Sequence, residues 1–536
     1  MVVTLPQPLF KNAHMNHNNN DFRRNWHLAE TAFKAKDWRK ALGFYRQIIA
    51  VNGNHVPSLI RLASIHIQLD DYGTARQFSL RASELPIGDL PSTLMLARQL
   101  VIFSEKKRLM DYLHALRTDA FTDCQALAEL SVLLNSAGDV HGALRLVDLA
   151  IARDSSFAPA YYFRGNLKTF IGDAEGAQQD LNRCIELKPS FAQAYWSLSN
   201  HKTHDAAIVA PGRIRKQLAL AKPGLKDEIY LSIALHNELH KSGDYENAWY
   251  ALAYGNKAKR KQVPYKHQAT LDLFSSLKRI DWQAMPDHAR NAVAQPQAPI
   301  FIVGMHRSGT TLLEQMLAGH SDILDGGESA SLITQLKRTA NSTKEVDAAL
   351  IDKLAAMDLS QVSGWYADNN SWRQNGNRYF TEKLPSNFQF IGFILKTIPG
   401  ARIINLVRDP MSTCFSNLRN LFNFECGYSY EQTELADYFV WYRGLMDYWR
   451  AQFPGAICDV HYADLVSDPA AEMQRVCVYL GVDYQPSMTA LDTKGKSVAT
   501  ASTVSVREGI QTDRNQQWMH YQAHLKPLIE RLAEFK

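Results

Sequence analysis

The chain has 536 residues, of which 46% are hydrophobic and 21% charged, and its formal net charge is +5. This length exceeds a single compact core and predicts two or more domains, while the ordinary composition excludes disordered and fibrous proteins. The small positive charge is compatible with local basic clefts for anionic ligands but gives no support for nucleic-acid binding.

The cysteines and the N-terminus bear on the compartment. Six cysteines are scattered without a C-x-x-C pair, which favours reduced packing thiols in a cytoplasmic protein over a disulfide framework or a zinc site. Residues 1–22 lack the basic start and apolar core of a secretory signal and predict a flexible tail. No run approaches eighteen apolar residues, so the sequence predicts no membrane span.

A repeat of 34 residues runs through the first half of the chain. Asp37 and Ala41 recur 34 residues later as Asp71 and Ala75. The further copies, the first of them degenerate, are Glu105 and Leu109, Asp139 and Ala143, and Asp173 and Ala177. This period with a small residue at a fixed place is typical of tetratricopeptide helix pairs, in which the alanine lets two helices approach closely and the aspartate fits the turn between them.

The repeat domain is expected to span residues 23–260. Its last fragment, KSGDYENAWYAL with Asp244 and Ala248, is out of phase after the helix-breaking APG of 210–212, so we expect an irregular joint and then a final helix pair. Such arrays bind peptide segments, form dimers or support a neighbouring domain, and the sequence alone selects none of these roles. A linker is predicted over residues 261–298.

From residue 299 to 536 the pattern changes to short apolar runs that alternate with helical segments. The predicted strands 300–303, 401–407 and 456–462 have the continuous apolar character of buried parallel strands. Each is followed by polar residues, HRSGTT, RDP and ADL, and ligands bind at this edge of an open α/β sheet. The predicted fold is therefore an all-α helical solenoid followed by an α/β P-loop-like domain with a mainly parallel sheet.

The segment IFIVGMHRSGTTLLEQM at 300–316 keeps the spacing of a Walker A loop but has Thr310 in place of its lysine. Its two glycines let amide groups point inward, and the following helix adds its positive end. Without the lysine clamp, a triphosphate suits the loop poorly, whereas an adenylyl phosphosulfate needs neither that clamp nor a metal ion. The candidate anion-binding residues are Arg307, Ser308, Gly309, Thr310 and Thr311.

The stretch GMHRSGTTLLEQML closely resembles the 5′-phosphosulfate loop of sulfotransferases that use 3′-phosphoadenosine 5′-phosphosulfate. It is most similar in style to tyrosylprotein sulfotransferases and to bacterial tetratricopeptide–sulfotransferase proteins, which share the two-part architecture. The resemblance covers most of residues 229–536, with His306 where the family usually has proline. It implies metal-independent, in-line transfer of a sulfuryl group to the hydroxyl of a peptide tyrosine, a carbohydrate or a small phenol.

The same resemblance suggests catalytic residues. Glu328, in LDGGESASL, lies where tyrosylprotein sulfotransferases keep their catalytic glutamate, and His320, in LAGHSD, is the alternative base because many other sulfotransferases use histidine. Glu328 could instead start the following helix, whose dipole would favour the ionised carboxylate and weaken it as a base. Lys383, in TEKLPSNF, resembles the family lysine that steadies the leaving phosphate together with Arg307, although a lysine in a polar loop is usually only solvated.

Two later segments resemble further parts of the family's nucleotide site. In LVRDPMSTCFSNLRN, Arg408 and Ser416 keep the spacing of the family's 3′-phosphate site, although Arg408 beside Asp409 also fits a structural ion pair. In STVSVREG, Ser502 and Arg507 are loosely similar to a segment that folds over the nucleotide, with the family's Q-V-[RK]-x-P pattern only partly kept.

Together these segments predict a sulfotransferase that uses the nucleotide sulfate donor without a metal ion. The repeat domain would present a polypeptide acceptor or form a homodimer. Two alternatives stay open. A P-loop nucleotide phosphotransferase would turn over ATP with magnesium, and a tetratricopeptide scaffold with an inactive nucleotide domain would bind adenosine bisphosphate without transfer.

Overall fold

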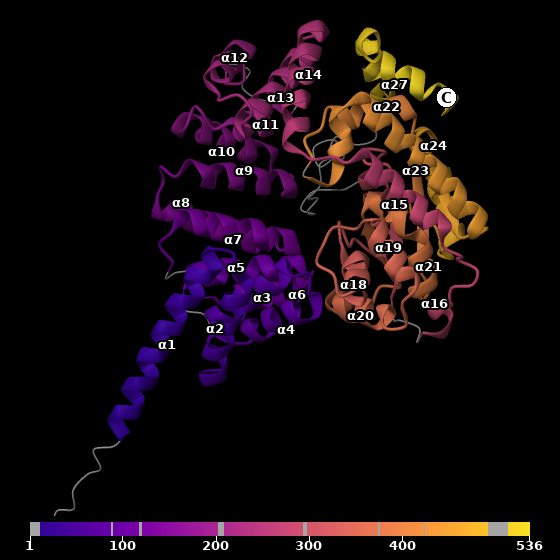
Figure 1. Cartoon of the computed structure of the whole chain (residues 1–536). Coiled ribbons are helices and arrows are strands. Elements are labelled where there is room, and N and C mark those ends of the chain that lie inside the picture. Colours follow the sequence, from indigo (N-terminus) through magenta and orange to yellow (C-terminus); the bar gives the residue numbers. More distant parts are fainter. Residues whose placement is uncertain are drawn as a thin grey trace, which may run out of the picture. The chain divides into compact units, whose positions relative to one another are not determined.

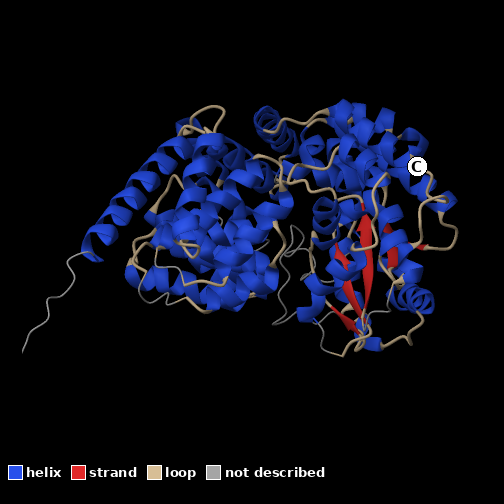
Figure 2. Ribbon diagram, turned by 60° about the horizontal axis from the view of Figure 1, so that its bottom comes forward, coloured by secondary structure: helices blue, strands red, loops and turns tan. Residues whose placement is uncertain are grey.

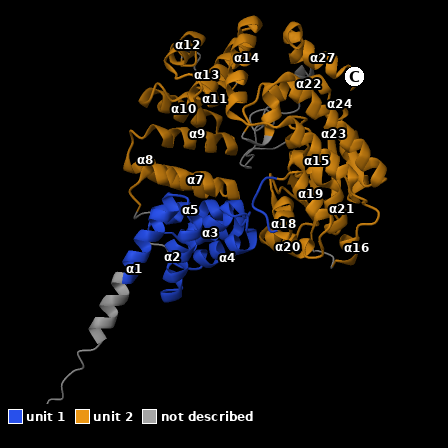
Figure 3. Ribbon diagram, in the orientation of Figure 1, with its two compact units in different colours: residues 1–117, 341–345 blue, residues 118–340, 346–536 orange. Residues whose placement is uncertain are grey.

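The computed structural model describes residues 11–86, 89–116, 121–201, 208–292, 297–373, 376–422, 424–490 and 513–535. It forms two compact units, residues 1–117 with 341–345 (unit 1) and residues 118–340 with 346–536 (unit 2) (Figure 3). The first ten residues of the expected tail lie outside the described residues, and the first helix begins at Lys11. The boundary between the units falls inside the predicted repeat region.

In unit 1 the 34-residue repeat forms pairs of helices, as the sequence predicts (Figure 1). Asp37 caps the second helix of its pair by accepting a hydrogen bond from the Lys40 amide, and Asp71 does the same for Thr74. Ala41 and Ala75 are fully buried where the helices approach. The helices of unit 1 are α1 (Lys11–Lys34), α2 (Trp38–Val51), α3 (Val56–Gln68), α4 (Tyr72–Ser83), α5 (Leu90–Ile102) and α6 (Lys106–His114).

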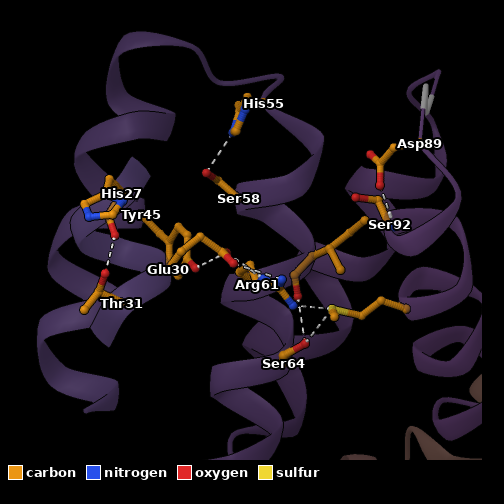
Figure 4. Close-up of polar contacts among 12 residues, drawn as sticks. His27, Glu30, Thr31, Tyr45, His55, Ser58, Arg61, Ser64, Asp89 and Ser92 are labelled. Atoms are coloured by element: carbon orange, nitrogen blue, oxygen red, sulfur yellow. Dashed lines mark hydrogen bonds and ion pairs between the residues drawn. The ribbon is translucent and has the colours of Figure 1, made fainter. Parts of the chain in front are cut away.

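A polar cluster ties the first three helices of unit 1 together (Figure 4). Glu30 on α1 accepts hydrogen bonds from the Tyr45 hydroxyl on α2 at 2.6 Å and from Arg61 Nε on α3 at 2.8 Å. The guanidinium of Arg61 also lies over the ring of Phe33, 4.6 Å from its centroid. The three side chains are largely buried, and the charges of Glu30 and Arg61 are paired with each other. The cluster therefore holds the three helices together without leaving an uncompensated charge.

Residues 341–345 belong to unit 1 although they come from the second half of the chain. Asp70, in the turn between α3 and α4, accepts hydrogen bonds from the Ser342 hydroxyl at 2.8 Å and the Thr343 amide at 2.7 Å. The Gly73 amide donates to Asn341 Oδ1 at 2.7 Å. The turn of the second repeat is thus the binding site for this segment.

The repeat continues in the first helices of unit 2. Asp139, Asp173 and Asp244 cap α8, α10 and α14, and the alanine four residues after each is fully buried. Pro211 opens α12, where its missing N–H is tolerated. These helices are α7 (Cys124–Ala137), α8 (Val140–Arg153), α9 (Ala158–Ile171), α10 (Ala174–Leu187), α11 (Ala192–Ser199), α12 (Pro211–Leu220), α13 (Lys226–Lys241), α14 (Tyr245–Gln262), α15 (His267–Arg279) and α16 (His288–Asn291).

The described part of unit 2 also contains a five-stranded parallel sheet of order β2-β3-β1-β4-β5 (Figure 2). Ile302 pairs with Lys383 and Gly304 with Leu406, so the carboxyl ends of the three middle strands meet at one edge. The predicted solenoid followed by an α/β domain with a mainly parallel sheet is confirmed. The strands are β1 (Ala298–Gly304), β2 (Ile323–Leu324), β3 (Tyr379–Lys383), β4 (Arg402–Val407) and β5 (Ile457–His461).

Helices cover both faces of the sheet, which explains the unbroken apolar sequence of β1. Ile300 and Ile302 pack with α17 (Thr310–Leu317), α24 (Tyr462–Ser467) and α25 (Pro469–Leu480) on one face. Phe301 and Val303 face the opposite cluster of buried residues. That cluster includes residues of α18 (Ser331–Thr339), α20 (Val362–Asn370), α21 (Ile391–Thr397), α22 (Pro410–Leu418) and α23 (Gln432–Gln452).

The remaining helices of unit 2 lie around this core. They are α19 (Ala348–Ala355), α27 (Lys526–Arg531) and the short 3₁₀ segments η2 (Ser371–Arg373), η3 (Pro385–Phe390), η4 (Phe424–Tyr430), η5 (Pro486–Met488), η6 (Asp513–His524) and η7 (Ala533–Phe535). Of all helices in the described ranges, none combines the length and the apolar character that crossing a bilayer requires.

Candidate functional site

The loop between β1 and α17 depends on two glycines. Gly304 and Gly309 have φ of +150° and +110°, a region that side chains with a β-carbon rarely occupy. A β-carbon at Gly304 would lie 2.8 Å from the Leu406 carbonyl oxygen, and one at Gly309 would lie 2.6 Å from the Tyr462 ring. The tight, closely packed turn expected from the sequence therefore has a steric reason at both glycines.

The start of α17 presents several hydrogen-bond donors. Gly309 is the N-cap residue and supplies no side-chain acceptor to the first amides of the helix. Thr310 and Thr311 are buried in the first turn. Ser308 is 1% exposed, and among the described residues its Oγ finds no hydrogen-bond partner. A helix start without a side-chain cap beside a buried, unpaired hydroxyl suits a small anion.

Arg307 joins this loop to the helix after β4. Its own backbone is left-handed, with φ of +67°. Its Nε donates a hydrogen bond of 3.2 Å to the Ser416 hydroxyl on α22, and its carbonyl oxygen accepts one of 3.2 Å from Arg408 Nη1. The two anion-binding segments expected from the sequence are thus brought into direct contact, although about a hundred residues separate them.

Asp409 and Arg408 have different structural environments. Asp409 caps α22, because its carboxylate accepts hydrogen bonds from the Ser412 amide at 2.7 Å and the Ser412 hydroxyl at 2.5 Å. The guanidinium of Arg408 lies over the Tyr462 ring, 4.6 Å from its centroid. Asp409 thus orients the helix that carries Ser416, while Arg408 lies at the carboxyl end of the sheet.

Lys383 and Glu328 form an ion pair near the same edge. Lys383 ends β3, with 1% of its side chain exposed, and its Nζ lies 2.5 Å from Glu328 Oε1. Glu328 follows β2, and 47% of its side chain is exposed. Helix α18 has Ala330, not Glu328, as its N-cap residue. The carboxylate therefore contacts a buried ammonium and is also open to solvent.

His320 lies away from this cluster. It precedes β2, at the amino end of the parallel sheet, whereas the other candidates follow the carboxyl ends of strands. Its Nδ1 accepts a hydrogen bond from the Asp322 amide at 2.9 Å, and its Nε2 donates to the Asp483 carbonyl at 2.8 Å. With both ring nitrogens engaged, His320 supports a loop and lies apart from the other candidate catalytic residues.

His306 occupies the position at which the resembled family usually has proline, and it lies close to Glu328, Lys383 and Arg307. Its Nδ1 is 2.9 Å from the Tyr428 hydroxyl, and its carbonyl oxygen accepts a hydrogen bond from Asn417 Nδ2 at 2.6 Å. Burial lowers the pKa of His306 to about 4. The negative charge of Glu328 acts to raise this pKa, and the positive charge of Lys383 acts to lower it. The imidazole is therefore neutral near pH 7.

Sequence reasoning missed several residues of the site. The residues that the motifs indicated are contacted by Tyr428, Asn417, Tyr462 and Glu314. The position of Tyr462, at the end of the third predicted strand, could have drawn attention to it. Ser502 and Arg507 were expected over the nucleotide, but both lie outside the described residues.

Two protein-family models match parts of the chain. Residues 299–486 match the model of the sulfotransferase family, and residues 158–191 match that of the tetratricopeptide repeat. The chain therefore combines a sulfotransferase-family domain with tetratricopeptide repeats.

Individual relatives are distant. An uncharacterized protein of Aquifex aeolicus (strain VF5) is 27% identical over 319 residues, which cover 56% of this chain but only 41% of that protein. A predicted protein-tyrosine sulfotransferase of Caenorhabditis briggsae is 23% identical over 197 residues, covering 35% of this chain and 67% of that protein. The solved sulfotransferase domain from the curacin biosynthetic pathway is 19% identical, covers 45% of this chain and 98% of its own, and has a TM-score of 0.31.

Proposed function

We propose that the chain transfers a sulfuryl group from 3′-phosphoadenosine 5′-phosphosulfate to an acceptor hydroxyl. The observation that carries this proposal is the 3.2 Å hydrogen bond from Arg307 to Ser416. It joins the loop after β1 to the helix after β4, so the two proposed anion-binding segments would belong to one site. A nucleotide with anionic groups at two separate positions suits such a site better than one with a single phosphate chain.

The residues present fit the two anionic ends of this donor. The loop offers uncapped helix amides and the unpaired, buried hydroxyl of Ser308 to the 5′-phosphosulfate. Guanidinium groups add charge-assisted hydrogen bonds, which are the stronger kind. Arg307, Ser308, Gly309, Thr310 and Thr311 would hold the 5′-phosphosulfate, and Arg408 and Ser416 the 3′-phosphate.

Glu328 is the proposed general base. It would take the proton of the acceptor hydroxyl as that oxygen bonds to sulfur and the bond from sulfur to the bridging phosphate oxygen breaks. Lys383 and Arg307 would balance the negative charge that grows on the leaving oxygen. The ion pair between Lys383 and Glu328 then has to open when both substrates bind, and the half-exposed side chain of Glu328 leaves room for that movement.

We propose that the reaction needs no metal ion. A kinase-type site uses a loop lysine and magnesium to neutralise a triphosphate. In this loop Thr310 takes the lysine's place, and the positive charge would come from Arg307 in the loop and Lys383 at the end of β3. A sulfuryl group carries less charge than a γ-phosphate, so these fixed cations would suffice.

The acceptor is proposed to be a peptide tyrosine, and the similarity to the Caenorhabditis briggsae protein supports this choice. A carbohydrate or a small phenol is the alternative acceptor.

The repeats would hold the polypeptide acceptor or form a homodimer. The six free cysteines, five of them buried, support a reducing, cytoplasmic location.

Thermal unfolding with adenosine 3′,5′-bisphosphate, ATP and GTP tests the nucleotide, because a ligand at a hundred times its Kd stabilises a protein by about 2.7 kcal/mol. We expect the largest rise in Tm with the bisphosphate. Arg408→Ala should remove that rise, whereas the control Arg402→Ala, at the amino end of the same strand, should keep it.

Transfer from labelled donor to tyrosine peptides, sugars and phenols, with and without a chelator, tests the reaction itself. Magnesium-dependent ATP turnover without sulfate transfer would instead identify a phosphotransferase. Bisphosphate binding with no transfer to any acceptor would identify an inactive scaffold.

A further inference from the structure

The ammonium of Lys383 lies between two carboxyl groups of different character. Glu328 is half-exposed and lies 2.5 Å from Nζ. Glu314, on α17, has 2% of its side chain exposed, and its Oε2 lies 3.9 Å from the same nitrogen. Lys383 itself is buried, so the charge state of both neighbours decides where its ammonium rests.

Glu314 is held in place from the neighbouring strand. The Thr381 hydroxyl on β3 donates a hydrogen bond of 3.0 Å to Glu314 Oε1, and the same hydroxyl accepts one of 2.9 Å from the Gly326 amide. A β-carbon at Gly326 would lie within 2 Å of the Thr381 carbonyl oxygen, so the loop that carries Glu328 must approach closely here. Glu314, Thr381 and this loop therefore form one packed unit beneath Lys383.

Burial raises the pKa of Glu314 to about 8, with a further contribution from Asp325 and a smaller one from Glu328. Lys383 and the Thr381 hydrogen bond act in the opposite direction. These are the charged groups that face Glu314 from β3 and from the loop after β2. The carboxyl group is therefore neutral at pH 7 and ionises as the pH rises through about 8.

We propose that Glu314 is a positioning residue that controls where Lys383 directs its ammonium group. While Glu314 is neutral, the ammonium stays on the Glu328 side, and when the substrates open that ion pair it is available to the leaving oxygen of the donor. Once Glu314 ionises, the flexible lysine side chain gains a buried anionic partner and turns inward, away from the reaction. This role rests on the proposed function, in which Lys383 stabilises that oxygen.

The test measures kcat/KM for sulfate transfer between pH 6 and 10 in three proteins. In the wild type we expect a loss of about tenfold per pH unit above the transition near pH 8. Glu314→Gln, which cannot ionise, should transfer sulfate and lack this alkaline loss. The control Glu382→Gln, a buried glutamate on the same strand as Lys383, should keep it. An unchanged alkaline loss in Glu314→Gln overturns the proposal, as does its absence from the wild type.

A second measurement is independent of activity. Because the folded-state pKa of Glu314 is raised above the unfolded value of 4.5, its contribution to stability is full below pH 4.5 and is lost as the pH rises to about 8. The Tm of Glu314→Gln should therefore rise relative to wild type across this window and stay level above it. A flat difference overturns the proposal.

The two measurements separate the two hypotheses. If the Tm difference follows this course but no acceptor is sulfated, the proposed function fails, and the positioning role that depends on it fails too, while the titration of Glu314 stands. If acceptors are sulfated but Glu314→Gln keeps the alkaline loss, the function stands and only the positioning role fails.

Discussion

The burial of Lys383 could not be predicted from its neighbours in the sequence. In TEKLPSNF it resembles a solvated loop lysine, yet it is the last residue of β3 and is 1% exposed. An ammonium group in this position costs several kcal/mol unless carboxylates pair with it. The carboxylate of Glu328 meets this requirement, and this pairing leaves the ammonium close to the loop after β1.

Two alanine substitutions should separate binding from chemistry. Arg307→Ala removes charge-assisted hydrogen bonds, each worth about 1.5–3 kcal/mol, and should weaken adenosine 3′,5′-bisphosphate binding about 10- to 100-fold and abolish transfer. Glu328→Ala should lower kcat at least about 100-fold but leave the Kd of the bisphosphate nearly unchanged. Calorimetric titration and a transfer assay measure both effects.

The outcome for Glu328 is the more decisive of the two. An equal loss of bisphosphate affinity in both variants would exclude Glu328 as the base. His320→Ala is the matched control: both of its ring nitrogens are engaged in loop hydrogen bonds, so it should lower Tm without a selective loss of kcat.

His306 predicts an acid-side loss of stability. Its pKa falls from 6.5 to about 4 on folding, chiefly through burial, so between these values the unfolded chain binds the proton more readily. The free energy of unfolding should therefore decrease as the pH falls from 6.5 to about 4. His306→Gln should reduce this decrease, as measured by thermal unfolding at several pH values. An identical pH dependence in the two proteins would contradict the prediction.

At the scale of elements, one position in the repeat decides how each helix pair turns. The residue before the capping aspartate is left-handed, and it is glycine at Gly138, Gly172 and Gly243. Lys36 and Asp70 occupy the same position with φ of 58° and 60°. The turn geometry is thus retained even where a side chain makes it strained.

Lys36→Gly should raise stability for this reason. Glycine adopts the left-handed region without the steric cost that lysine incurs, and we expect a gain of about 0.5–1 kcal/mol. Gly172→Ala is the reverse change at the equivalent turn and should cost a similar amount. Thermal unfolding of both variants checks the pair, and a lower Tm for Lys36→Gly would contradict the prediction.

Strands differ in how well their sequences reveal them. Three strands of the sheet, β1, β4 and β5, were predicted: β1 and β4 are mainly apolar, whereas β5, ICDVH, is interrupted by Asp459. β3, YFTEK, was missed because it is buried yet ends in charged residues that have partners in the fold. β2 has only two residues, Ile323 and Leu324, and is defined by its pairing with β3 and not by a pattern of its own.

At the scale of the whole molecule, Asp70 links parts of the chain that are far apart in sequence. It accepts hydrogen bonds from the Ser342 hydroxyl and the Thr343 amide, 272 and 273 residues away. The described candidate site residues, by contrast, all belong to unit 2. Loss of the Asp70 link should therefore affect segment 341–345 and not nucleotide binding.

Asp70→Gly tests this separation while keeping a residue suited to the left-handed turn. Removing an acceptor worth about 1.5–3 kcal/mol should speed amide hydrogen exchange at Thr343 about 10- to 100-fold. The Kd of adenosine 3′,5′-bisphosphate should stay unchanged. Lys36→Gly, at the equivalent position one repeat earlier, should leave exchange at Thr343 as in the wild type. Unchanged exchange in Asp70→Gly would refute the link.

The sequence by itself determined the local features of this protein. The 34-residue period follows from a capping aspartate and a buried alanine such as Asp139 and Ala143, both of which act within one helix pair. The glycine spacing of the loop from Gly304 to Gly309 is equally local, because backbone freedom at these two residues and the donors between them are visible within a few residues.

Only the tertiary structure decided which of these features work together. Contacts between Arg307 and Ser416, and between Glu314 and Lys383, require strands that are adjacent in the sheet but distant along the chain. The parallel strands have their carboxyl ends at one edge of the sheet, and His320 lies at the opposite, amino end. Burial at the carboxyl edge raises the pKa of Glu314 and so keeps it neutral at pH 7. Such proximity has no signal in a linear pattern, because it arises from packing.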